Sequence, residues 1–131
     1  MSEVIKVLIV DDESTVQSII STFVKRYFDS KGMNCEIKTV TDPVQGLFLL
    51  NSYGNTFRIV LLDVRLPKLT GDEIYNSLLH GDGEILDRVM FITGYPNDIL
   101  DRFPDLNLNI LQKPFRYDDL KDKLEGLMSS N

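Results

Sequence analysis

Residues 58–72, RIVLLDVRLPKLTGD, contain an apolar run that stops at a carboxylate and is followed by turn-forming residues. About four to eight consecutive apolar residues between turn signals are typical of a strand buried on both faces. The run at residues 59–62 fits that pattern, so Asp63 is expected where the strand leaves the core. Pro67 and Gly71 then indicate a loop. A carboxylate at such a place can take part in chemistry if other polar groups reach the same edge.

The rest of the chain alternates between strand and helix patterns. Apolar and β-branched runs predict strands at residues 4–10, 35–40, 57–62, 88–92 and 108–111. Apolar residues at helical spacing predict helices from residue 14, from Asp42-Pro43, over 72–79 and over 117–128. Pro96 and Pro104 leave room for only about two helical turns, so a helix between them is expected to be short. Five strands alternating with five helices predict an α/β fold with a doubly wound parallel sheet.

The first two helices have apolar positions that predict which side packs on the sheet. In the first helix these positions are Val16, Ile19, Ile20, Phe23, Val24 and Tyr27. In the second helix the expected buried side chains are Val44, Leu47, Phe48 and Leu50.

Length and composition favour a single domain over residues 1–131, with a core over about residues 4–128. No segment approaches the ~20 apolar residues of a membrane span, so no contact with a membrane is expected. A strand pattern that starts at Val4 leaves no space for a secretory signal, and a cytoplasmic location is therefore expected. The net charge of -6 argues against direct binding of nucleic acid by this domain, because a phosphate backbone needs a basic face.

Polar residues follow the predicted strands and are expected to meet at one edge of the sheet. Asp11 and Asp12 follow the first strand, Asp63 the third, Thr93 the fourth and Lys113 the fifth. In an open parallel sheet the carboxyl ends of the strands form the usual ligand crevice. Three carboxylates there would repel one another unless a cation lay among them. Magnesium fits this set because it binds carboxylates, waters and phosphate oxygens, and manganese is a second candidate.

Each of these signals also has a purely structural interpretation. The acidic residues 11–13 could cap the following helix, since the helix dipole favours negative charge at its N-terminus. Thr93 could be a turn residue at a strand end, and Lys113 a solvated side chain before a rigid Lys-Pro junction that has access to a cis bond. Their convergence on one edge is what favours a functional site.

Taken together, these motifs resemble the receiver domain of the response regulators of two-component signal transduction. The resemblance covers nearly the whole chain, and its combination of motifs is specific. The matching residues are Asp11-Asp12, Asp63 with Pro67 four and Gly71 eight positions later, Thr93-Gly94, and Lys113-Pro114-Phe115. The resemblance implies a CheY-like, flavodoxin-like (βα)5 fold with strand order 2-1-3-4-5.

The resemblance also implies a role for each residue of the set. Asp63 would be the phosphoacceptor, and Thr93 and Lys113 would contact the phosphoryl group. Magnesium would be held by Asp11, Asp12, Asp63 and the main-chain carbonyl of Arg65. Such a domain accepts the phosphoryl group from a phosphohistidine, changes conformation, and hydrolyses the aspartyl phosphate. It is a signalling protein, and its catalysis is limited to its own phosphorylation and dephosphorylation.

The implied partners are a histidine kinase or a histidine phosphotransfer protein, with the apolar side of the first helix as the docking surface. The output would pass to a downstream protein or to a fused output domain. The sequence is compatible with a stand-alone receiver and with part of a longer regulator.

Two features depart from the family pattern, and both concern the output. Ile110 lies three residues before Lys113, where the family often has Tyr or Phe, so no ring or hydroxyl is available at this switch position. The short helix after Pro96 predicts a curtailed output face. Arg65, Gly94 and Tyr95 flank the site and are expected to modulate the lifetime of the phosphoryl group; simple packing or solvated charge is the alternative for the two large side chains.

Two other functions are compatible with parts of this sequence. A phosphatase of the haloacid dehalogenase type would use Asp11 as nucleophile, but residues 11–15, DDEST, have Glu13 where a second Asp is usual, and the chain is short for that class. A receiver-like docking module that never carries phosphate is the other alternative, and the complete set of pocket residues argues against it.

Overall fold

The computed structural model describes residues 3–53, 56–63, 73, 76, 87–104 and 108–129. Its centre is a parallel sheet of five strands in the order β2-β1-β3-β4-β5. The strands are β1 (Val4–Val10), β2 (Asn34–Val40), β3 (Ile59–Asp63), β4 (Val89–Thr93) and β5 (Asn109–Gln112). The predicted doubly wound α/β fold and its strand order are therefore confirmed.

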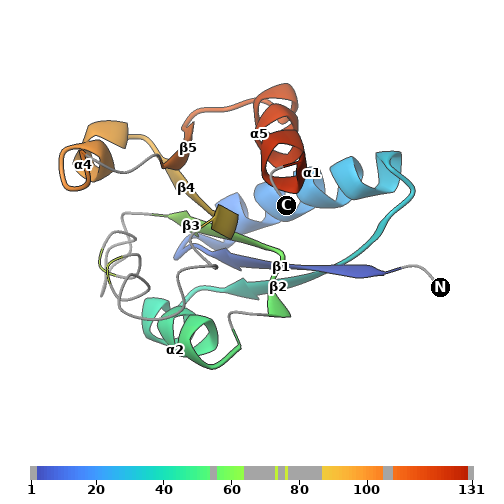
Figure 1. Ribbon diagram of the computed structural model, residues 1–131, viewed down its shortest axis with the longest axis horizontal. Coiled ribbons are helices and arrows are strands. Elements are labelled where there is room, and N and C mark those ends of the chain that lie inside the picture. The colour runs from blue at the N-terminus through green and yellow to red at the C-terminus, as the bar shows by residue number, and fades with distance from the viewer. Residues whose placement is uncertain are drawn as a thin grey trace.

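Helices cover both faces of this sheet (Figure 1). They are α1 (Ser14–Ser30), α2 (Pro43–Tyr53), α4 (Pro96–Leu100) and α5 (Tyr117–Ser129). α1 and α5 lie side by side on one face, and α2 lies on the other. Most of the helix predicted over residues 72–79 is outside the described residues, although Glu73 and Asn76 are helical. No helix within the described ranges is both long and apolar enough to span a membrane.

Alternation along the strands produces two hydrophobic cores. Successive side chains of a strand point to opposite faces, so a run without polar residues supplies both cores at once. In β3, Ile59 and Leu61 pack toward α1 and α5, whereas Val60 and Leu62 pack in the cluster that contains Leu50 of α2. All five residues of β3 are buried, and so are all five of β4. This burial restrains the ends of both strands, where Asp63 and Thr93 lie.

The buried side of α2 differs from the prediction. Val44 and Phe48, predicted to be buried, are 52% and 59% exposed, and the helix turns Pro43, Gly46 and Leu50 inward. Gly46 lies so close to β1 that a Cβ there would be 3.0 Å from Val10 Cγ1. Because adjacent helical positions are about 100° apart, this close approach decides which side faces the sheet. The prediction that Val44 and Phe48 are buried was wrong because α2 carries apolar residues on several sides, so the apolar pattern does not single out the side that faces the sheet.

Elsewhere the differences from the predicted elements are small. Ile19 of α1 is 47% exposed, so it lies at the border of the apolar stripe rather than within it. α1 ends at Ser30, and the chain turns away two residues later at Gly32, whose positive φ of 69° suits a residue without a Cβ. α4 has five residues, which confirms the short helix expected after Pro96. β3 and β4 extend to Asp63 and Thr93, so both polar residues are the last of their strands rather than the first of a loop.

Candidate functional site

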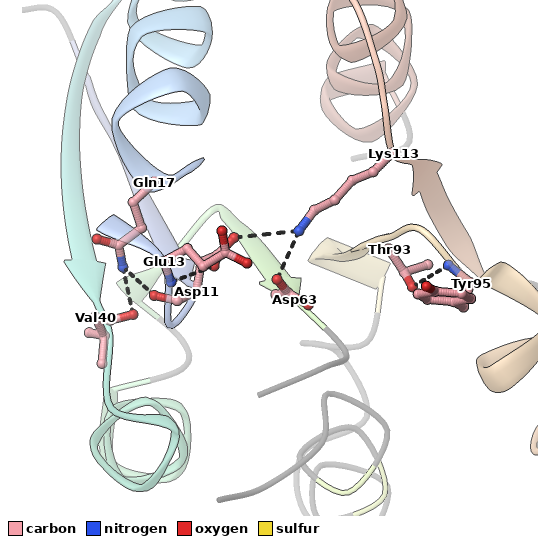
Figure 2. Close-up of polar contacts among 8 residues, drawn as sticks. All are labelled: Asp11, Glu13, Gln17, Val40, Asp63, Thr93, Tyr95 and Lys113. Carbon is pink, nitrogen blue, oxygen red and sulfur yellow. Dashed lines mark hydrogen bonds and ion pairs between the residues drawn. The ribbon is translucent and has the colours of Figure 1, made fainter. Parts of the chain in front are cut away.

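The carboxyl ends of four strands bring the predicted polar residues together (Figure 2). Asp11 directly follows β1, Asp63 ends β3, Thr93 ends β4 and Lys113 directly follows β5. The order of the strands places Asp63 between Asp11 and Thr93, and the Lys113 side chain extends toward the carboxylates, as Figure 2 shows. Parallel pairing produces this convergence, because every strand of such a sheet ends at the same edge.

Three carboxylates form the acidic side of the site. Oxygen atoms of Asp11, Asp12 and Asp63 all lie within 4.8 Å of one another. Asp11 is 1% exposed and Asp63 is 6% exposed, whereas Asp12 is exposed. Oδ1 of Asp11 accepts a hydrogen bond from the main-chain N–H of Glu13 at 2.9 Å. Oδ2 of Asp11 is buried and has no hydrogen-bond partner among the described residues.

Lys113 provides positive charge to this cluster. Its Nζ donates to Oδ2 of Asp63 at 2.8 Å and lies 3.8 Å from Oδ2 of Asp11. The main-chain N–H of Lys113 donates to the carbonyl of Thr93 at 2.7 Å, which anchors the residue at the edge of the sheet. The Lys113–Pro114 peptide bond is cis. Burial alone would lower the pKa of the ammonium, but the hydrogen bond and attraction to Asp63, with the charge of Asp11, raise it.

The electrostatics of Asp11 favour a bound cation. Burial, the largest cause, and the neighbouring charges of Asp63 and Asp12 raise the pKa of Asp11 to about 6, against the lowering effects of the Glu13 N–H and Lys113. Oδ2 of Asp11 is a buried acceptor without a donor. The atoms of this cluster that could bind a metal are all carboxylate oxygens, which are hard ligands of the kind that magnesium prefers in proteins. The three carboxylates therefore fit a divalent cation such as magnesium.

Thr93 and Tyr95 form the other side of the site. The Thr93 side chain is 1% exposed, and its Oγ1 accepts a hydrogen bond from the main-chain N–H of Tyr95 at 2.9 Å. Tyr95 itself is 58% exposed. A Cβ added to Gly94 would meet nothing within 4 Å, so space is open beside this turn. Because the Tyr95 N–H donates to the Thr93 hydroxyl, a movement of this hydroxyl would break that hydrogen bond or shift the backbone that leads into α4.

Some of the predicted residues lie away from the carboxylate cluster or outside the described residues. Arg65, Pro67 and Gly71 are outside them, so the predicted carbonyl ligand and loop are not placed. Ile110 is half-buried, pairs with Phe91 of β4, and packs against the core on the α2 side of the sheet.

Gln17 also lies beside the cluster, although no motif in the sequence pointed to it. Its side chain is buried, and its Nε2 donates to the main-chain carbonyls of Asp11 and Val40. The sequence did contain a sign that Gln17 is buried. Residues 17, 20 and 24 lie on one side of the helix, and Ile20 and Val24 are core residues. A polar residue in such a row needs a buried partner.

Comparison with known proteins agrees with the fold. The family model of the response regulator receiver domain matches residues 7–125. The chain belongs to the response regulator receiver domain family, a component of two-component systems.

The individual relatives are distant in sequence. An uncharacterized response regulatory protein of Vibrio cholerae serotype O1 is 25% identical over 121 residues, which cover 92% of this chain and 47% of that protein. The chain thus spans about half the length of the curated relative it matches. The crystal structure of a response regulator receiver domain protein from Clostridium thermocellum has a TM-score of 0.72 at 22% identity, covering 96% of this chain and 95% of that one.

A further solved structure includes a metal. The receiver domain of a sensor histidine kinase from Pseudomonas aeruginosa, with a magnesium ion coordinated in its active site cleft, has a TM-score of 0.77 at 18% identity. The match covers 97% of this chain and 99% of that one. At such identities the likeness to these two structures shows the fold.

Proposed function

We propose that this protein accepts a phosphoryl group from a phosphohistidine onto Asp63 in a magnesium-dependent reaction and later hydrolyses the aspartyl phosphate. The observation that carries the proposal is the buried Asp63 carboxylate, bonded to Lys113 and grouped with Asp11 and Asp12. The donor is a histidine kinase or a histidine phosphotransfer protein in the cytoplasm. The protein is a signalling switch whose catalysis is limited to its own phosphoryl group.

The transfer begins when a carboxylate oxygen of Asp63 attacks the phosphorus of the donor in line. The new O–P bond forms as the P–N bond to the histidine breaks, and the imidazole leaves with that electron pair. A divalent cation held by Asp11, Asp12 and Asp63, with the carbonyl of Arg65, would supply positive charge that offsets the charge of the phosphoryl oxygens. Lys113 then exchanges its bond to the free carboxylate for a bond to a phosphoryl oxygen.

The donor protein is expected to dock on an apolar groove beside the site. This groove is lined by Val16, Ile19 and Phe23 of α1 and by Lys113, Pro114 and Phe115 after β5. Ile19 is 47% exposed, so apolar surface is available there for a partner. A phosphohistidine carried on an apolar helix surface would reach the Lys113 side of the cluster from this groove.

Loss of the phosphoryl group is a second reaction of the same site. A water that attacks phosphorus releases phosphate and restores the Asp63 carboxylate. Access of that water is limited by the residues around the pocket, which is why Arg65, Gly94 and Tyr95 are proposed to modulate the phosphoryl lifetime. Faster dephosphorylation is expected in Tyr95→Ala and in Arg65→Ala, and unchanged rates would remove both from this role.

The signal is proposed to leave the site through the Tyr95 turn or α1. A phosphoryl group on Asp63 would attract the Thr93 hydroxyl, which now accepts from the Tyr95 N–H. Ile110 has no hydroxyl to follow that movement, and α4 has only five residues. The receiver of the change is a downstream protein or a fused output domain. A rearrangement confined to α4 and β5 on binding of a phosphoryl mimic would contradict this route.

Incubation with magnesium and a small phosphodonor tests the central proposal. Intact-mass measurement is expected to show one phosphoryl adduct in the wild type and none in Asp63→Asn. Asp63→Asn keeps the shape of the side chain but removes its nucleophilic charge. If the wild type forms no adduct, the chain is a docking module without phosphate chemistry. If Asp63→Asn still forms the adduct, the acceptor is another residue.

A further inference from the structure

Gln17 of α1 links the ends of two strands beside the carboxylate cluster. Its side chain is 6% exposed, and its Nε2 donates to the carbonyl of Val40 at 2.7 Å and to the carbonyl of Asp11 at 3.0 Å. Figure 2 shows the amide between β2 and the start of the Asp11–Glu13 turn. One amide group thus satisfies two backbone acceptors at the site edge, and both contacts are buried.

These bonds restrict the main chain of Asp11 on both sides. The N–H of Asp11 donates to the carbonyl of Val40 at 3.0 Å, and the carbonyl of Asp11 accepts from Gln17. Val40 O therefore receives two hydrogen bonds, which join β1, β2 and α1 at one point. The Asp11 carbonyl belongs to the peptide plane between Asp11 and Asp12, so fixing its orientation restrains the backbone from which both carboxylates extend.

The cluster needs such restraint. Asp11, Asp12 and Asp63 carry like charges with oxygens within 4.8 Å, so their mutual repulsion favours turning the side chains apart. Oδ1 of Asp11 is held by the Glu13 N–H, but Oδ2 has no hydrogen bond among the described residues. Gln17 restrains the backbone as a neutral donor, which adds no positive charge that would compete with a cation.

We propose that Gln17 is a positioning residue for the divalent cation: its amide fixes the Asp11–Asp12 peptide so that both carboxylates point at the ion. This inference rests on the proposed function, because it assumes that the three carboxylates bind a cation. Groups that orient metal ligands commonly change metal affinity about 10–100-fold when they are removed. The role is distinct from catalysis, since Gln17 would act only through the ligands.

The test compares Mn²⁺ affinity in the wild type and two variants of the 131-residue chain, measured from the electron paramagnetic resonance signal of free Mn²⁺. Gln17→Met keeps the length of the side chain and removes the donor. Val24→Ala is the matched control, because Val24 is 0% exposed in the same helix and contacts the core rather than the site. We expect Gln17→Met to raise the dissociation constant about tenfold and Val24→Ala to leave it unchanged, although both lower the thermal midpoint.

The outcomes separate the two proposals. If the wild type does not bind Mn²⁺, the proposed function fails and this inference with it. If the wild type binds and Gln17→Met binds within twofold as tightly, the inference alone is wrong. Equal weakening in Gln17→Met and Val24→Ala would also overturn it, because the effect would then be one of general stability.

A measurement on the wild type covers the case in which Gln17→Met does not fold. During titration with Mg²⁺, the side-chain amide signals of Gln17 in a ¹⁵N-correlated NMR spectrum are expected to shift with the same midpoint as the backbone signals of Asp11 and Asp12. The side-chain amide of Gln45 is the control, because it lies on the exposed side of α2. A Gln17 signal that stays in place while Asp11 and Asp12 shift would overturn the inference.

Discussion

The ammonium of Lys113 lies 2.8 Å from Oδ2 of Asp63 and reaches it from β5 across the end of β4. The same Nζ is 3.8 Å from Oδ2 of Asp11, so the Lys113 ammonium lies between two carboxylates at the ends of two other strands. Lys113 therefore stabilises the acidic cluster while also standing where an incoming phosphoryl group needs positive charge. Removal of the Lys113 charge is therefore expected to raise the affinity for a divalent cation and to lower the rate of phosphorylation.

Lys113→Met is expected to bind divalent cations more tightly and to be phosphorylated more slowly. Loss of a positive charge near the carboxylates should lower the Mn²⁺ dissociation constant roughly tenfold. Loss of the same charge from the phosphoryl oxygens should slow adduct formation by about a hundredfold. Mn²⁺ titration and phosphorylation by a small donor measure the two effects. Lys121→Met, on the exposed side of α5, is the control, and a parallel loss of both properties would contradict this account.

Asp11→Asn is expected to stabilise the metal-free protein above pH 6. The pKa of Asp11 is raised from 3.8 to about 6, so the folded state binds its proton more tightly than the unfolded state. The contribution of the protonated carboxyl to stability is therefore present below pH 4 and is lost as the pH rises to about 6. The loss is at most about 3 kcal/mol.

Urea unfolding in a chelator, at several pH values between 4 and 7, tests this expectation. The advantage of Asp11→Asn over the wild type should grow with pH, and Mg²⁺ should reverse it in favour of the wild type. Asp12→Asn, whose side chain is exposed, should change stability much less. An advantage of Asp11→Asn that does not depend on pH would show that charge is not its cause.

Thr93→Val is expected to uncouple the pocket from the turn that follows β4. The substitution removes the acceptor of the Tyr95 N–H and should cost about 1 kcal/mol of stability. With beryllofluoride as the phosphoryl mimic, NMR shifts of the Gly94 and Tyr95 amides should be smaller than in the wild type. Thr93→Ser keeps the hydroxyl and should retain the shifts. Equal shifts in wild type and Thr93→Val would mean that the hydroxyl does not transmit the change.

Two glycine substitutions test the packing of the helices. Gly46→Ala would place a Cβ 3.0 Å and 3.1 Å from the two methyl carbons of Val10, and is expected to destabilise the protein by about 1–3 kcal/mol. Gly126→Ala in α5 meets nothing within 4 Å and should stabilise by up to about 1 kcal/mol. Denaturant unfolding of both variants is the measurement. A neutral Gly46→Ala would show that α2 can move away from β1 at little cost.

The fold was predictable because its signals are local. The uninterrupted apolar runs before Asp63 and Thr93 identified buried strands. Apolar residues at intervals of three and four positions identified α1 and α5. The buried side of α2 was not predictable, because a helix with apolar residues on several sides does not indicate which one faces the sheet. The close approach of Gly46 to Val10 decides that side, and it exists only after α2 and β1 have packed.

The sequence by itself determined which polar residues lie at the carboxyl ends of the strands, and hence that Asp11, Asp63, Thr93 and Lys113 meet at one edge, because parallel strands end together. Only the tertiary structure decided how these groups share charge: that Lys113 bonds to Asp63, and that Oδ2 of Asp11 is buried without a donor. It also decided that Gln17 holds the Asp11 backbone. Such contacts join residues that are distant in the chain, and they depend on how the strands and helices pack, which no spacing in a sequence encodes.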